Sequence, residues 1–202
     1  GGTYFYKGVI SGRKNVFVTE QYLDLMAKAL NEAELKRDIK NLAYVIMPNY
    51  FCWMFRLNER QDNPVEIYGN VKKDVALGIL KGLDDEIKNK TYDIYDLFQA
   101  NHRVGRSTPR TIRWAFKEFA KKTEGKKFSV WVPHTEISLV ENEAMLQEKL
   151  ELITRAPASE RWQLVDRSDK YPYLYVAEEL TQKASLMEKI CPQMSFAMPV
   201  AA

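Results

Sequence analysis

The 202-residue sequence has little of what usually builds metal centres and disulfides, with only two histidines and two cysteines. Cys52 and Cys191 lie far apart and form no CxxC pair, so the sequence indicates neither a disulfide framework nor a zinc ribbon. It also lacks a glycine-rich phosphate loop, a G-x-S-x-G motif and an H-E-x-x-H motif. These absences argue against P-loop NTPases, α/β-hydrolases and zinc metalloproteases.

Long hydrophobic runs are absent too. No apolar stretch approaches the roughly 20 residues that cross a bilayer, and the N-terminus has no basic segment followed by an apolar one. We therefore expect a soluble, cytoplasmic protein with no membrane partner. The chain does have 46% hydrophobic and 12% aromatic residues, enough for one sizeable core, so one domain is the default.

The most apolar stretch, residues 42–57, predicts a β-hairpin. Pro48 fixes φ and donates no hydrogen bond, and Asn49 tolerates turn conformations, so the chain should reverse there. Period-two alternation puts Tyr50 and Cys52 on one face of the second strand and aromatic residues on the other. Because both faces are apolar, we expect a central strand that is covered on both sides.

Other segments have the periodicity of strands and helices. Residues 4–10 alternate like an opening strand, and Thr19 is placed to cap a helix that should end near Leu35. Residues 58–64 are polar and loop-like. Further helices are predicted over 71–87, 92–98 and 141–153, and a further strand over 128–131.

The clearest helix follows Ser107 and Thr108, where a hydroxyl N-cap precedes Pro109 at the first helical position. Cations recur along this helix at steps of three and four, which puts them on one face. From residue 103 to 127, nine Lys/Arg against two Glu give a local net charge of +7, whereas the whole chain carries +3. The stripe comprises Arg106, Arg110, Arg113, Lys117 and Lys121.

This basic stripe favours a polyanion-binding surface, although lysines and arginines also coat ordinary exposed helices. Cations bind phosphates, and aromatic faces stack unpaired bases. Trp114 lies off the centre of the helix's apolar face, so it is a candidate for base stacking, with core packing as the alternative. Arg13 and Lys14 add two cations in a turn near the N-terminus.

Several short motifs occur in an order that resembles the single-tyrosine HUH transposases of insertion sequences, particularly the REP-associated branch. Residues 45–49, VIMPN, are similar to the start of the family motif V-x-M-P-N-H-x-H. Gly12, Asn15 and Phe17 occupy a turn where the family has N-R-G-x-x-x-x-x-F, with the arginine-glycine pair scrambled here. The family's W…Y-I-x-x-N-P-V…G-L-V…Y-P-W-S ending is matched by Trp131, Leu152-Ile153, Ala156-Pro157, Leu164-Val165 and Tyr171-Pro172-Tyr173.

The resemblance implies an α+β fold with an antiparallel β-sheet and helices packed on one face, the ferredoxin/RRM-like HUH transposase core. It also implies a metal-dependent reaction, in which two histidines hold Mg²⁺ or Mn²⁺ and a tyrosine on a following helix attacks the DNA phosphate. Tyr50 and Cys52 stand at the two histidine positions, and a phenol and a thiol suit these hard ions poorly. We therefore expect no metal site and no cofactor.

The nucleophile is missing as well, because residues 132–152, where the family places its tyrosine, contain none. His134 beside a proline is better explained as a loop or packing residue, and His102 as support for binding. We expect one transposase-like domain over 3–176 with an insertion at 58–106, followed by an extension over 177–202.

These observations lead to a hypothesis: a transposase-like protein without nuclease activity that binds single-stranded or hairpin DNA through the basic stripe. The alternative is a protein-interaction or structural module that does not bind DNA, in which the sheet face of Tyr50, Cys52 and Met54 forms a homodimer contact. An active nuclease with displaced ligands ranks last, because the metal pair and the tyrosine are missing together.

Overall fold

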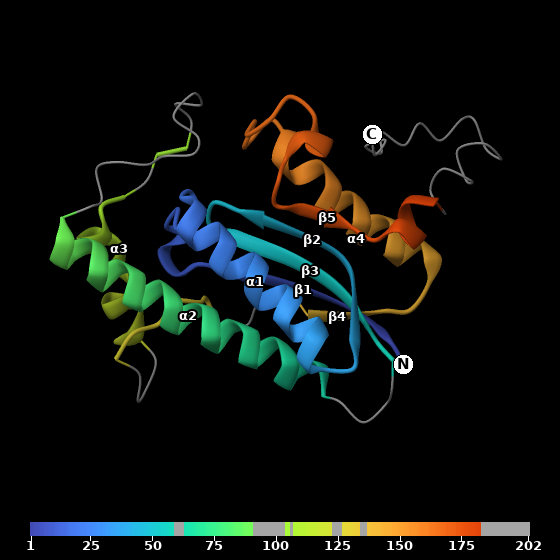
Figure 1. Ribbon diagram of the computed structural model, residues 1–202, viewed down its shortest axis with the longest axis horizontal. Helices are drawn as coiled ribbons and strands as arrows, with labels where there is room; N and C mark the ends of the chain where they lie inside the picture. Colours follow the sequence, from blue (N-terminus) through green and yellow to red (C-terminus); the bar gives the residue numbers. More distant parts are fainter. Residues whose placement is uncertain (59–62, 91–103, 106, 123–126, 134–136, 183–202) are drawn as a thin grey trace.

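The computed structural model describes residues 1–58, 63–90, 104–105, 107–122, 127–133 and 137–182. Within these ranges, five antiparallel strands form one sheet in the order β4-β1-β3-β2-β5 (Figure 1). The predicted α+β fold with an antiparallel sheet is confirmed. The strands are β1 (Thr3–Val9), β2 (Ile39–Met47), β3 (Tyr50–Leu57), β4 (Ile137–Val140) and β5 (Leu174–Val176), and the helices are α1 (Glu20–Lys36), α2 (Pro64–Asn89), α3 (Pro109–Ala120) and α4 (Glu143–Arg155).

The predicted hairpin is confirmed as β2 and β3, and β3 is the central strand. The chain reverses at Pro48 and Asn49, and the segment after β1 donates backbone hydrogen bonds to this turn. The Pro48 carbonyl accepts hydrogen bonds from the backbone N–H groups of Val16 and Phe17, at 2.9 and 3.0 Å. The Asn49 carbonyl accepts one from Ile10 at 2.8 Å. The turn is therefore a fixed part of the fold.

Alternation along β3 gives the sheet two apolar faces, and both are covered. Phe51, Trp53 and Phe55 are buried under α1 and α2. Cys52 and Met54 are buried on the opposite face, under α4 and the chain that follows it (Figure 1). The double cover predicted from the sequence is confirmed, and α4 is a layer beyond the one-sided helix packing that the family resemblance implied.

The helices α1 and α2 pack closely because α2 has glycines where they meet. A Cβ atom at Gly78 would lie 2.7 Å from Leu25 Cδ1, and one at Gly82 would lie 2.7 Å from Gln21 Nε2. These glycines weaken the sequence signal for a helix, yet they are what allows the close approach.

The helix α2 also begins earlier than predicted. It starts at Pro64, after an Asn63 cap whose Oδ1 accepts a hydrogen bond from the Val65 N–H at 3.0 Å. The helix α2, which lies within the segment 58–106 that was expected as an insertion, thus supplies part of the main core. The domain boundaries at 3–176 and 177–202 stay predictions.

One buried polar group links the sheet to α1. The pairing of β2 with β3 shifts register between Asn41 and Ala43, and Asn41 is only 1% exposed. Its Oδ1 accepts a hydrogen bond from Trp53 Nε1 at 2.8 Å, and its Nδ2 donates to the Leu30 carbonyl at 3.1 Å. Because the amide is satisfied on both sides, it fixes the position of the Trp53 ring.

Some sequence predictions differ from the structure. Residues 128–131 form no regular strand, and the Ile10–Trp131 pair is an isolated bridge. The short strands β4 and β5 were not predicted. Thr19 precedes α1 as expected, but its side chain makes no capping hydrogen bond. The predicted helix at 92–98 lies outside the described residues.

The chain continues in contact with the sheet after β5. Leu180 is buried in the core on the α4 side. The Glu179 carboxylate pairs with Lys40 at 2.6 Å and with Arg56 at 3.1 Å. In the described part of the chain, no helix is both long and apolar enough to cross a membrane.

Candidate nucleic-acid interface

The helix α3 forms where its sequence signals place it. Thr108 is the N-cap, with Oγ1 accepting a hydrogen bond from the Thr111 N–H at 3.3 Å, and Pro109 occupies the first turn. Ile112 and Phe116 are fully buried and join the core beside α2. The opposite side of the helix faces solvent, so the cations predicted as a stripe are presented outward.

Among the described cations of the stripe, Arg110, Arg113 and Lys117 line one hollow beside α3, but the cations have different environments. Arg113 pairs with the Asp84 carboxylate at the end of α2, with Nη2 3.3 Å from Oδ2, and its guanidinium lies 4.6 Å from the centre of the Phe128 ring. Lys121 pairs with Glu118 at 2.6 Å. Within the described residues, Arg110 and Lys117 are exposed and make no ion pair.

Arg106, also predicted in the stripe, lies outside the described residues. Trp114 stands on the exposed side of the helix, between Arg110 and Lys117. Its side chain is 61% exposed, so the core-packing alternative for Trp114 is wrong. A hollow of about 360 Å³ between α3 and the end of α2 is lined by Arg110, Arg113, Trp114 and Lys117 of α3 and by Asp84 and Ile87 of α2.

The cationic turn near the N-terminus lies beside α3. Gly12 and Arg13 both have positive φ, at 65° and 48°, which makes the turn compact. A Cβ atom at Gly12 would lie 3.2 Å from the Phe119 ring. On its other side, the Arg13 carbonyl accepts a hydrogen bond from Asn49 Nδ2 at 3.2 Å. The turn thus lies between α3 and the β2–β3 turn, with Arg13 exposed and Lys14 half-buried.

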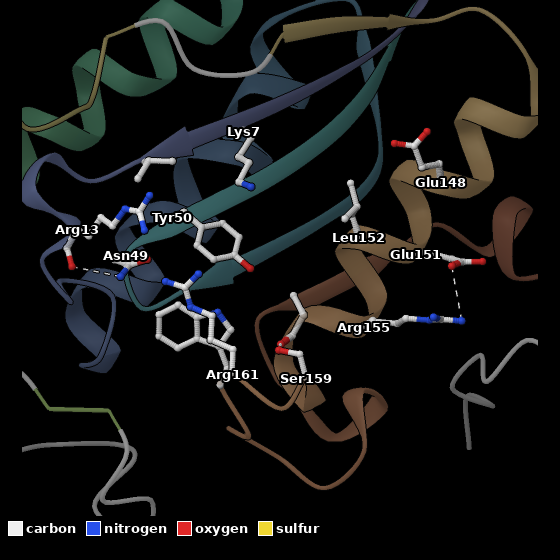
Figure 2. Close-up of a pocket in the computed structure, with 13 residues that line it drawn as sticks. Lys7, Arg13, Asn49, Tyr50, Glu148, Glu151, Leu152, Arg155, Ser159 and Arg161 are labelled. Carbon is white, nitrogen blue, oxygen red and sulfur yellow. Dashed lines mark hydrogen bonds and ion pairs between the residues drawn. The ribbon is translucent and has the colours of Figure 1, made fainter.

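A second feature is a cavity of about 480 Å³ between the sheet and α4, centred on Tyr50 (Figure 2). Tyr50 is half-buried, and Cys52 is buried two residues further along the same face. Of the residues singled out from the sequence, Tyr50 and Arg13 line this cavity. Sequence reasoning missed the others with charge, which are Lys7, Glu148, Glu151, Arg155 and Arg161.

Lys7 had a signal that could have been used. It is the cation within the apolar strand β1, it is the register partner of Cys52, and alternation puts it on the α4 face. Its Nζ lies 5.3 Å from the centre of the Tyr50 ring. Arg161 had no such signal, because it follows α4 in an irregular segment.

The donors at the family's histidine positions do not suit a hard metal ion. Burial raises the pKa of the Tyr50 hydroxyl well above its ordinary value, and the neighbouring Cys52 adds to this, while Trp162 and the charge of Arg161 oppose it. The phenol is therefore neutral near pH 7, and Cys52 is a buried, soft thiol. With Lys7 also facing this point, the site does not fit the Mg²⁺ or Mn²⁺ that the family resemblance implies.

The helix α4 occupies the place where the resemblance puts the tyrosine nucleophile. Towards the cavity it presents Glu148, Glu151, Leu152 and Arg155, and none of these is a hydroxyl nucleophile. Both carboxylates are paired within the helix, Glu148 with Lys149 at 3.3 Å and Glu151 with Arg155 at 3.5 Å. The two histidines, His102 and His134, lie outside the described residues.

The sequence matches no family model and no curated protein sequence. Among solved structures, it is similar to a REP-associated tyrosine transposase bound to a REP hairpin, with a TM-score of 0.54 and 13% identity. The match covers 100% of this chain and 87% of that chain. The overall fold is thus similar to that of this transposase. At this identity the likeness shows the fold, and it confirms at that level what the M-P-N turn and the later motifs indicated.

The transposase-like fold also bears on the dimer alternative. Cys52 and Met54 are 3% and 0% exposed because α4 and the following chain cover them. A second copy could reach that face only if this cover moved away. The face proposed for a homodimer contact is therefore not an exposed apolar patch in this structure.

Proposed function

We propose that this protein binds single-stranded or hairpin DNA through the outer face of α3 and does not cleave it. The observation that carries the proposal is the exposure of Trp114 among cations on a helix whose apolar face is already buried. An exposed tryptophan contributes nothing to the core, whereas beside cations it provides a surface on which an unpaired base can stack.

The charges on α3 are available to phosphates. Arg110 and Lys117 are exposed and make no ion pair in the described part of the chain, so binding a phosphate would break no ion pair there. Arg113 is held by Asp84, but an exposed pair of this kind contributes little to stability and is weakened by salt. The Phe128 ring keeps its guanidinium oriented.

The spacing of Trp114 and the cations along α3 brings their side chains together. Trp114 lies four residues after Arg110 and three before Lys117, so all three side chains are neighbours on the helix. The hollow that they share with Arg113 has a volume of about 360 Å³. Contacts of this kind give affinity for phosphates and bases with little sequence readout.

Fold similarity supports the choice of ligand, since a solved structure with a similar fold is that of a transposase bound to a REP hairpin. The absence of cleavage is inferred from the chain itself. The two positions that should hold the metal are a neutral phenol and a buried thiol, and α4 brings no tyrosine to the cavity. A nicking assay with Mg²⁺ or Mn²⁺ should give no cleaved strand and no covalent adduct.

Replacing Arg110 and Lys117 together with glutamine should weaken binding to a labelled DNA hairpin about tenfold at low salt, because two phosphate contacts are lost. The slope of log affinity against log salt should become shallower by roughly 1 to 2. Fluorescence anisotropy at several salt concentrations measures both quantities.

The matched control makes the same charge change on α1, with Lys28→Gln and Lys36→Gln. These side chains are 76% and 69% exposed, so the net charge falls equally while α3 stays intact. Equal weakening by both double variants would mean that net charge alone drives binding. No binding by the wild type at low salt would reject the proposal and favour the protein-interaction alternative.

Trp114→Ala should weaken binding to single-stranded DNA about tenfold and leave matched duplex nearly unaffected, because stacking needs an unpaired base. Trp114→Phe keeps an aromatic face and should retain most of the affinity. Competition between single strand and duplex in one titration gives the ratio directly. If duplex binding falls as much as single-strand binding, Trp114 does not act as a stacking platform.

A further inference from the structure

We propose that the cavity around Tyr50 binds the terminal phosphate of a nucleotide without a metal ion, with Lys7, Arg13 and Arg161 supplying the positive charge. The ligand chemistry is a phosphate monoester attached to a nucleoside, either at the end of a DNA strand or in a free mononucleotide. The inference deepens the proposed function by adding a second contact to the same class of ligand, but the cavity does not depend on the α3 face.

The lining of the cavity has more cations than carboxylates. Its lining has the four cations Lys7, Arg13, Arg155 and Arg161 and the two carboxylates Glu148 and Glu151. Both carboxylates are paired with cations of α4. Lys7, Arg13 and Arg161 make no ion pair within the described residues, so three positive charges share the cavity without a compensating carboxylate.

The three cations without an ion-pair partner among the described residues lie on the Tyr50 side of the cavity. Lys7 Nζ lies 5.3 Å from the centre of the Tyr50 ring. The positive charge of Arg161, in the segment after α4, acts to lower the pKa of the Tyr50 hydroxyl. Arg161 also lies over the Trp162 ring, at 5.3 Å from its centre, which limits where the guanidinium can point. Figure 2 shows Lys7, Arg13 and Arg161 on the Tyr50 side of the cavity, away from Glu151 and Arg155.

Tyr50 itself completes the site. Its hydroxyl stays protonated near pH 7 because burial raises its pKa, so it can donate a hydrogen bond to a phosphate oxygen. A phenolate in the same place would repel the phosphate. The Tyr50 ring lines the cavity wall. Tyr50 thus places a neutral donor in the cavity that Lys7, Arg13 and Arg161 also line.

The charge also selects the kind of phosphate. A phosphate monoester carries nearly two negative charges at neutral pH, whereas an internal phosphodiester carries one. Three uncompensated cations favour the doubly charged group, which occurs at a strand end or in a mononucleotide. The volume of about 480 Å³ is within the range of small-ligand sites, and the cavity opens beside the Arg13 turn that contacts α3.

The test uses the full chain in EDTA, which removes divalent metals. A 12-nucleotide single strand is compared without a terminal phosphate, with a 5′ phosphate and with a 3′ phosphate, and dTMP is used as a competitor. One of the phosphorylated strands should bind about tenfold more tightly than the strand that lacks the phosphate, in keeping with charge-assisted hydrogen bonds to one group. Displacement by dTMP would identify the free nucleotide as a source, and failure of dTMP with retained preference would identify the strand end.

The double variant Lys7→Gln with Arg161→Gln should abolish this preference, while Arg161→Lys, which keeps the charge, should retain most of it. Circular dichroism confirms that each variant is folded. The α3 variant Arg110→Gln with Lys117→Gln should weaken all strands equally and leave the preference unchanged, so failure of the proposed function is distinguished from failure of this site. No preference for a terminal phosphate, a preference that survives in the Lys7 and Arg161 variant, or inorganic phosphate that competes as well as dTMP would overturn the inference.

Discussion

Trp53→Ala should lower the free energy of unfolding by about 3 to 5 kcal/mol, the range for truncation of a buried large aromatic residue. Trp53 is fully buried in the central strand and packs on Phe55, with ring centres 4.3 Å apart. Its removal leaves a cavity under α1 and leaves the Asn41 Oδ1 without its donor. Urea denaturation followed by circular dichroism measures the change.

Trp53 has a matched control in Trp114, which is the same residue on the surface. Trp114→Ala should change the free energy of unfolding by no more than about 0.5 kcal/mol, because its side chain makes little contact with the core. The two variants should therefore separate stability from binding: Trp53→Ala loses stability, and Trp114→Ala loses single-strand affinity. Similar stability losses in both would show that α3 is packed differently from this structure.

Gly8→Val should cost about 3 kcal/mol, at the upper end of the range for overpacking. Gly8 is buried in β1 opposite Phe51, and a Cβ atom there would lie 2.3 Å from Phe51 Cε1. The Phe51 ring cannot move aside easily, because it lies against Trp131 and Tyr68 with ring centres 5.5 and 6.1 Å away. Thermal unfolding should show a clear drop in Tm.

Another glycine gives the opposite expectation. Gly69 is exposed in α2, and a Cβ atom there would have no neighbour within 4 Å. Gly69→Ala should therefore raise the free energy of unfolding by about 0.5 to 1 kcal/mol through helix propensity.

For the Gly8→Val variant, an unchanged free energy of unfolding would mean that the register of β1 against β3 differs from the one described.

The parts of the fold that the sequence predicted are those determined by local chemistry. Pro48 and Asn49 specify the hairpin turn, and Thr108 with Pro109 specifies the start of α3, because each signal acts within a few residues. The position of Trp114 off the centre of the same helix's apolar face left exposure and core packing both open, and the structure shows the side chain exposed. Apolar residues on both faces of β3 indicated a second cover, although not which segment provides it.

The parts that were not predicted depend on residues distant in sequence. Gly78 and Gly82 look like helix breakers until α1 lies against them. The buried hydrogen bonds of the Asn41 side chain were not predicted, because its partners Trp53 and Leu30 lie in a later strand and an earlier helix. The cavity could not be foreseen because Lys7 and Arg161 come from opposite ends of the described chain.

The two covers of the sheet differ in how they are connected to it, and this has a consequence for folding. The strands β1, β2 and β3 and the helices α1 and α2 are contiguous, so one face can close through short chain excursions. The other face is closed by α4, whose chain returns to β2 from about a hundred residues later, at a greater entropic cost. We therefore expect amide hydrogens in α4 and β5 to exchange before those of β3, so that the molecule opens first along the cavity around Tyr50.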